Sequence, residues 1–224
     1  MSLDTSRARA AILGRIRSAQ GRSGAITDVE RAQVDAYLAN PPRAPRPTVG
    51  ADVVAHFESQ AQRMSATTER VATLADAPAA VARYLAAHGL PTQAVCWPAL
   101  GGLDWGGAGL SVRAGPPTGD DRVGITGAFA AVAETGTLVL ASGPETHAST
   151  HLLPETHVAI VERGRVVAHY EDAFARARVE LGVLPRAFNL VSGPSRTADI
   201  EQTLVLGAHG PYRVHVLVVE QPAP

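Results

Sequence analysis

The chain has 224 residues, of which 46% are hydrophobic and 18% are charged, and its formal net charge is −1. This length suits one sizeable α/β domain with a small appendage. The balance of 20 basic against 21 acidic residues leaves no surplus positive charge for nucleic acid or an anionic membrane. No apolar run approaches the roughly 20 residues of a membrane-spanning helix, and the N-terminus lacks a secretory signal pattern. We therefore predict a cytoplasmic protein with no membrane span and no nucleic-acid partner.

Two absences exclude several classes of chemistry. The chain contains no lysine, which excludes a Walker A loop, a Schiff-base enzyme and a lysine general base. Cys96 is the only cysteine, which excludes disulfides, cysteine-rich zinc sites and a self-contained iron–sulfur cluster. We therefore expect no such cofactor to be held by this chain.

Residues 1–48 predict a helical arm followed by a proline-rich linker. One helix is expected over about 6–20, and a capping box at Thr27-Asp28-Val29-Glu30 opens a second helix to about residue 38. Four prolines within residues 40–47 then form a stiff, extended segment. The α/β domain is expected over residues 49–224.

In this domain, strand-like and helical segments alternate. Helices are predicted over about 51–64, 77–88, 127–135, 170–181 and 198–206. Strands are predicted over about 92–100, 123–125, 137–142, 157–162, 188–192 and 214–220, and most of them are apolar and β-branched. This alternation predicts a Rossmann-like, mostly parallel sheet with helices on both faces.

The first segment with potential chemistry runs from Gly124 to Thr137. A strand is expected to enter a glycine-rich turn and a short helix, whose free amides near its N-terminus face a ligand. Glu134 is a lone acid in an apolar run and is the candidate catalytic base. In the alternative interpretation, Thr126 caps the helix and Gly136 ends it. The candidate ligand-binding residues of this segment are Thr126, Gly127, Thr135, Gly136 and Thr137.

The second segment contains three histidines. His147 and His151 are four residues apart and would share a helix face, and His157 follows after a proline. With Glu145 and Glu155 they are weak candidates for a metal site. The alternative is a polar loop in which the histidines are incidental. We expect no metal here, because nothing fixes the position of His157 relative to the other two.

The third segment covers residues 191–211. A strand ends at Ser192, a tight turn follows, and Ser195 or Thr197 is expected to cap a helix. Free amides, hydroxyls and Arg196 resemble an anion cradle, whereas the nearby acids favour a ligand with hydroxyls or a cationic edge. The candidate ligand-binding residues of this segment are Ser192, Gly193, Ser195, Arg196, Thr197, Asp199 and His209.

The combination of the motifs AETGT, LLPETH, SGPSRTADIE and GAHGP resembles the lactate utilization protein C family, which carries the LUD domain. The resemblance covers roughly residues 50–220. It implies a fold like that of the NagB/RpiA/CoA-transferase group. It also implies a role beside two iron–sulfur partner proteins in the bacterial oxidation of L-lactate to pyruvate, with the clusters on those partners.

We therefore expect a component of an L-lactate-oxidising complex rather than a self-sufficient enzyme. Its ligand pocket is expected at the strand ends, where Glu134, Arg196 and Asp199 should lie close together. Arg196 suits a small carboxylate, and a nucleotide-like ligand also fits. The alternatives are a stand-alone enzyme acting on small phosphorylated or acyl substrates, and a non-catalytic assembly module whose arm docks a partner.

Overall fold

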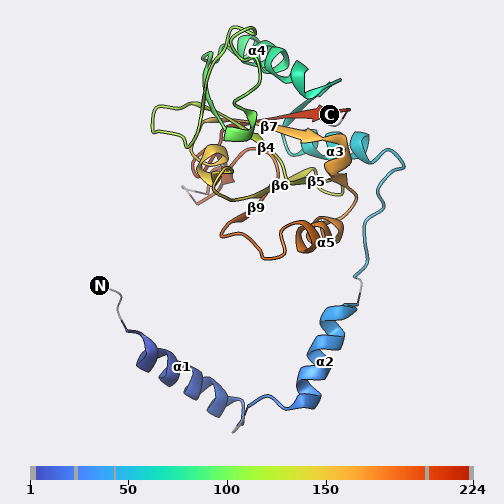
Figure 1. Ribbon diagram of the computed structural model, residues 1–224, viewed down its shortest axis with the longest axis vertical. Helices are drawn as coiled ribbons and strands as arrows, with labels where there is room; N and C mark the ends of the chain where they lie inside the picture. The colour runs from blue at the N-terminus through green and yellow to red at the C-terminus, as the bar shows by residue number, and fades with distance from the viewer. Residues whose placement is uncertain (1–3, 23–24, 43, 200–201, 222–224) are drawn as a thin grey trace. The chain divides into compact units, whose positions relative to one another are not determined.

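The computed structural model describes residues 4–22, 25–42, 44–199 and 202–221 (Figure 1). The chain divides into two compact units, residues 1–45 and residues 46–224. In the first unit, α1 (Ser6–Ala19) and α2 (Asp28–Ala39) are helices, as predicted. The predicted capping box is present, since the amide of Glu30 donates to Thr27 Oγ1 and the amide of Thr27 donates to Glu30 Oε2. Neither helix contains a buried residue.

The second unit is built on a six-stranded sheet in which every neighbouring pair is parallel. The strand order is β1-β12-β7-β4-β2-β3. The strands are β1 (Thr67–Val71), β2 (Gln93–Cys96), β3 (Ser111–Ala114), β4 (Val123–Gly127), β7 (Thr156–Glu162) and β12 (Arg213–Val219). This mostly parallel α/β architecture confirms the predicted fold class.

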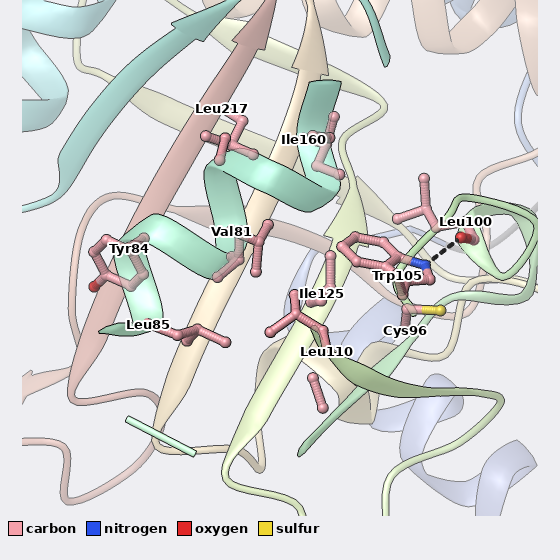
Figure 2. Packing of buried hydrophobic residues seen from close by; sticks show 14 of the residues in the cluster. Val81, Tyr84, Leu85, Cys96, Leu100, Trp105, Leu110, Ile125, Ile160 and Leu217 are labelled. Atoms are coloured by element: carbon pink, nitrogen blue, oxygen red, sulfur yellow. Dashed lines mark hydrogen bonds between the residues drawn. The ribbon is translucent and has the colours of Figure 1, made fainter. Parts of the chain in front are cut away.

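One face of this sheet is covered by α4 (Ala77–Ala87). The buried side chains of Val81 and Leu85 pack against Ile125, Ile160 and Leu217 of three sheet strands (Figure 2). Trp105 belongs to the same cluster, and its indole N–H donates to the carbonyl of Leu100 over 2.8 Å. The apolar strand residues that face α4 thus form one continuous core layer.

The opposite face is covered by α3 (Val53–Arg63) and a second sheet. Val54, Phe57 and Ala61 of α3 are buried at helical spacing. The second sheet has the order β8-β5-β6-β9, with β8 (Val166–Val167), β5 (Ala130–Val132), β6 (Thr137–Ala141) and β9 (Phe188–Val191). Its outer face is covered by α5 (Tyr170–Glu180). In Figure 1, α4 and α5 lie on opposite sides of this unit, with the strands between them.

The predicted helix over 127–135 is wrong. β4 continues to Gly127, and β5 forms an antiparallel hairpin with β6. Alanines and valines fill β5 because it is buried on both faces: Ala131 faces the core against α3, and Ala130 faces the core against α5. An apolar run of this kind has no period that separates a buried strand from a buried helix. The predicted strands over 137–142 and 188–192 are also present, as neighbours in this antiparallel sheet.

The predicted helix over 198–206 is also wrong in its described part. β10 (Arg196–Thr197) and β11 (Val205–Leu206) form a short antiparallel ribbon instead, and residues 200–201 of the prediction lie outside the described residues. Two backbone bonds fix this loop, one from the Ser195 amide to the Pro211 carbonyl and one from the Gly207 amide to the Ser195 carbonyl, each 2.9 Å long. Gln202 has φ +56°, which a right-handed helix does not allow.

Candidate functional site

The order of the parallel strands reverses between β2 and β4. After β2 the chain continues to the edge strand β3, whereas after β4 it continues through β7 to β12 in the other direction. Open α/β sheets bind ligands outside the carboxyl ends of the strands at such a reversal. The fold therefore indicates where a ligand site is expected, before any side chain is considered.

A cavity of about 490 Å³ lies at this position. Its wall includes residues at the carboxyl ends of β2, β4 and β7, and we call it the switch-point cavity. The wall is formed by Leu74, Trp97, Ala99, Leu100, Gly127, Ala128, Phe129, Ala141, Ser142, Gly143, Thr146, Ile160, Glu162, Arg165 and Leu181.

Buried apolar side chains form much of this wall. Trp97, Leu100 and Ile160 are each less than a tenth exposed. The indole N–H of Trp97 donates to the carbonyl of His147 over 3.0 Å, which fixes the orientation of its ring. A Cβ at Gly127 would lie 3.7 Å from that ring, so the ring packs directly over the end of β4.

The polar groups of the wall are few. Thr146 Oγ1 is occupied, since it donates to the carbonyl of Ala141 over 2.8 Å. Arg165 forms an ion pair with Glu180, and its guanidinium lies 5.7 Å from the centroid of the Phe129 ring. Glu162 is half-buried, and no side chain among the described residues pairs with its carboxylate. The cavity thus combines an apolar wall with one acceptor group that has no partner.

The residues that the sequence predicts for the ligand site lie mostly elsewhere. Gly127 is the one of them that forms part of the switch-point wall. Thr126, its neighbour, is fully buried, and its Oγ1 lies 2.8 Å from Nε2 of His157. Since β4 runs through both residues, neither is at a helix N-terminus. The predicted ligand site at the free amides of a helix N-terminus is therefore wrong.

Glu134 begins the turn of residues 134–137, which we call the ETGT turn. Its Oε2 lies 2.8 Å from Nδ1 of His169, and the two side chains are 10% and 14% exposed, respectively. His169 directly precedes α5. His169 is absent from the candidates predicted from the sequence, although a buried acid in an apolar run needs a polar partner.

A cluster of hydroxyl groups joins the same turn to α5 and to the residue after β9. Tyr170 Oη lies 2.9 Å from Oγ1 of both Thr135 and Thr137, and these two threonine oxygens are 2.7 Å apart. Thr137 Oγ1 is also bonded to Ser192 Oγ. The hydrogen bond between Thr137 and Ser192 thus joins the first and third predicted segments, and both of these side chains are at least half-buried.

Both of these segments pack against the C-terminal part of α3. Gly136 has φ +66°, and a Cβ there would lie 2.2 Å from the amide nitrogen of Ala61. Gly193 has φ +68°, and its Cβ would lie 2.0 Å from the carbonyl oxygen of Met64. These two glycines are required because backbone meets backbone at both positions, in a conformation that side-chain-bearing residues rarely adopt.

Arg196 also binds this part of the chain. It is exposed, and its Nη2 donates to the Met64 carbonyl over 2.7 Å and to Ser65 Oγ over 2.5 Å. Glu134 is therefore bonded to His169, and Arg196 is bonded to the residues after α3. These bonds do not join Glu134 to Arg196. Asp199 is exposed, and its amide donates to Thr197 Oγ1 over 3.1 Å.

The loop that contains His209 lies beside Ser195. The His209 amide is 3.4 Å from Ser195 Oγ, and His209 lines a second cavity of about 290 Å³. The other residues of this cavity are Leu152, Leu153, Glu155, Gly207, Ala208, Gly210 and Tyr212. Ser195 and the GAHGP loop are thus in contact, and His209 lines a cavity different from the switch-point cavity.

Two of the three candidate metal-binding histidines are buried between the two sheets. The rings of His151 and His157 are 5.8 Å apart, and Nε2 of His151 lies 2.7 Å from the side-chain amide of Asn189. His147 contributes its carbonyl to Trp97, as described above. Among the described residues, no group of three His, Cys, Asp or Glu side chains is arranged to hold a metal ion.

Burial sets the protonation of these groups. Loss of solvent lowers the pKa of His151 to about 4 and the pKa of His157 to about 3, and repulsion from His151 adds to the second shift. Burial also lowers the pKa of His215 to about 4 and raises the pKa of Cys96 to about 11. His151, His157 and His215 are therefore neutral at pH 7, and the thiol of Cys96 is protonated.

Part of the chain is similar to known proteins. Residues 120–219, from the loop before β4 to the end of β12, match the family model of the LUD domain.

In the described parts of the chain, no helix is both long enough and apolar enough to cross a membrane.

Three curated relatives are named lactate utilization protein C. The protein of Bacillus licheniformis is 40% identical over 102 residues, that of Geobacillus thermodenitrificans 42% over 101 residues, and that of Bacillus subtilis 40% over 101 residues. Each alignment covers 44% of this chain and 42% of the relative. The aligned stretch thus spans less than half the length of the curated relatives.

A solved structure of a DUF162 family protein from Deinococcus radiodurans shares the fold. Its TM-score is 0.56 at 22% sequence identity, and the match covers 77% of this chain and 99% of that one. Residues 120–219 are thus similar to the LUD domain, and part of the chain is similar to proteins named lactate utilization protein C.

Proposed function

We propose that this chain acts in lactate utilization, as a component that works with iron–sulfur partner proteins in the oxidation of L-lactate to pyruvate. The observation that carries the proposal is the identity of about 40% over about 100 residues to proteins named lactate utilization protein C. Because those alignments cover 42% of the relatives, the activity of the whole relative is a hypothesis for this chain.

The chemistry of the chain supports dependence on partners. Oxidation of L-lactate to pyruvate releases two electrons and two protons, so an acceptor for the electrons is required. An iron–sulfur cluster of the usual kind needs several thiolate ligands. This chain has Cys96 alone, and that residue is buried with a raised pKa. Its residues do not fit such a cluster, so the proposal assigns the clusters to the partner proteins.

The site residues in this proposal are those around the ETGT turn. Glu134 and His169 form a carboxylate–imidazole pair, which is able to accept or donate a proton. The hydroxyls of Thr135, Thr137 and Tyr170 lie beside this pair along the chain. We propose that Glu134 takes part in the reaction and that these hydroxyls bind the ligand.

Reconstitution tests the proposal. The chain and the proteins encoded beside its gene are purified separately, and L-lactate-dependent reduction of a soluble dye is measured for each and for the mixture. We expect oxidation by the mixture alone. Oxidation by this chain without partners would favour a stand-alone enzyme, and full oxidation by the partners without this chain would exclude a catalytic contribution.

A further inference from the structure

The switch-point cavity is too large for lactate. At no more than about 30 Å³ per heavy atom, the volume of a molecule in liquid water, the roughly six heavy atoms of lactate fill less than about 180 Å³. The cavity measures about 490 Å³. It therefore falls in the size range of pockets for larger organic ligands, about 300–1,000 Å³.

The wall is also unsuited to an anion. Trp97, Leu100 and Ile160 would desolvate a carboxylate without replacing its hydrogen bonds. The cation of the wall, Arg165, is already paired with Glu180. Glu162 adds a negative charge at the same place. A small hydroxy acid or a phosphate would therefore lose its hydration in this cavity and be repelled by the carboxylate of Glu162.

Glu162 is the polar group that a ligand can satisfy. It ends β7 and lies two residues after Ile160 on the same side of the strand. The neighbouring arginines pair with other acids, Arg163 with Glu220 and Arg165 with Glu180. An ionised carboxylate accepts hydrogen bonds and donates none. The matching group on a ligand is thus an O–H or N–H donor.

We propose that the switch-point cavity binds an uncharged organic ligand with an aromatic ring body and an O–H or N–H donor directed at Glu162. The ring body fits the apolar wall between Trp97 and Phe129, and the donor satisfies the carboxylate. A ligand of this class is a ring-bearing cofactor or carrier, not the hydroxy acid. This inference rests on the cavity and is independent of the proposed role in lactate utilization.

Three matched probes test the ligand class by isothermal titration calorimetry of the full chain at pH 7. These are 2-naphthol, which is neutral and has a donor, 2-methoxynaphthalene, which lacks the donor, and 2-naphthoate, which is an anion. We expect saturable binding of one 2-naphthol per chain. The other two probes should bind about tenfold more weakly or worse, because a hydrogen bond to a charged acceptor is lost or replaced by repulsion.

Variants then assign the effect to Glu162. Glu162→Gln should reduce the preference for 2-naphthol over 2-methoxynaphthalene by several-fold and strengthen the binding of 2-naphthoate. Glu145→Gln is the matched control, since Glu145 is exposed and lies outside the cavity wall, and it should leave all three affinities unchanged. If Glu162→Gln alters folding, the comparison of the three probes on the unaltered chain still decides.

Three results would overturn the proposal. They are equal binding of 2-naphthol and 2-methoxynaphthalene, absence of saturable binding by all three probes, and displacement of 2-naphthol by millimolar L-lactate. None of them bears on the reconstitution assay, which asks whether the chain is required for lactate oxidation. The two proposals therefore succeed or fail separately.

Discussion

We expect acid to destabilise this fold through three buried histidines. His151, His157 and His215 are each at most 3% exposed. Their pKa values in the folded chain, about 4, 3 and 4, lie below the value of about 6.5 expected after unfolding. Between these values the unfolded chain binds more protons than the folded chain, so stability falls as the pH falls below 6.5.

The size of the effect follows from this difference. Each histidine lowers the free energy of unfolding by about 1.4 kcal/mol per pH unit in that window. From pH 6.5, where the unfolded histidine is already half protonated, to pH 5, the loss is about 1.6 kcal/mol for each histidine and about 5 kcal/mol for all three. Typical domains have stabilities of about 5–15 kcal/mol. We therefore expect the chain to be close to unfolding near pH 5, while the stability between pH 7 and pH 8 changes little from this cause.

Urea unfolding followed by circular dichroism at pH 7.5, 6.5, 5.5 and 5.0 measures this dependence. His157→Gln should reduce the slope below pH 6.5 by about 1.4 kcal/mol per pH unit, whatever its effect at pH 7.5. His209→Gln is the control, because His209 is exposed, and it should leave the slope unchanged. A stability that stays constant from pH 7.5 to pH 5 would refute the argument that burial keeps these histidines neutral.

Further predictions concern the ETGT turn and the arm. Gly136→Ala should lower the free energy of unfolding by about 2–4 kcal/mol, because the added Cβ would overlap the backbone of α3 at a position with positive φ. The control Gly119→Ala, at an open position, should change the free energy of unfolding by less than about 1 kcal/mol. Glu134→Gln should lower the rate of lactate oxidation by the reconstituted system much more than it lowers the thermal unfolding temperature. A loss of rate that only tracks unfolding would make Glu134 a structural partner of His169. Residues 46–224 alone should unfold within a few degrees of the full chain, since α1 and α2 contain no buried residue, and a large drop would contradict this.

Much of the fold is predictable from local patterns. The capping box at Thr27 marked the start of α2, and the β-branched runs of β7 and β12 marked central strands because both faces are buried. The helices α3, α4 and α5 were also located within a few residues. The wrong predictions concern segments whose secondary structure is determined by tertiary contacts. An alanine-rich run became β5 between two layers, and residues after Arg196 became a ribbon tied to Pro211.

The site was harder to predict than the fold. The motifs around Gly136 and Gly193 have a packing role against α3, which no local pattern shows because α3 is distant in sequence. The switch-point cavity depends on the order of strands in the sheet, and a single sequence does not reveal that order. One signal was available: Glu162 is a lone acid at the carboxyl end of a buried apolar strand, a position at which α/β folds place ligand contacts.

The rate of L-lactate oxidation by the purified partner proteins, measured with and without this chain, tests the proposed role in lactate utilization. We expect pyruvate formation and dye reduction only when the chain is present, with no activity from the chain alone. Added Glu134→Gln protein should restore much less activity than the unaltered chain. Equal pyruvate formation with and without the chain would contradict the proposed role in lactate utilization.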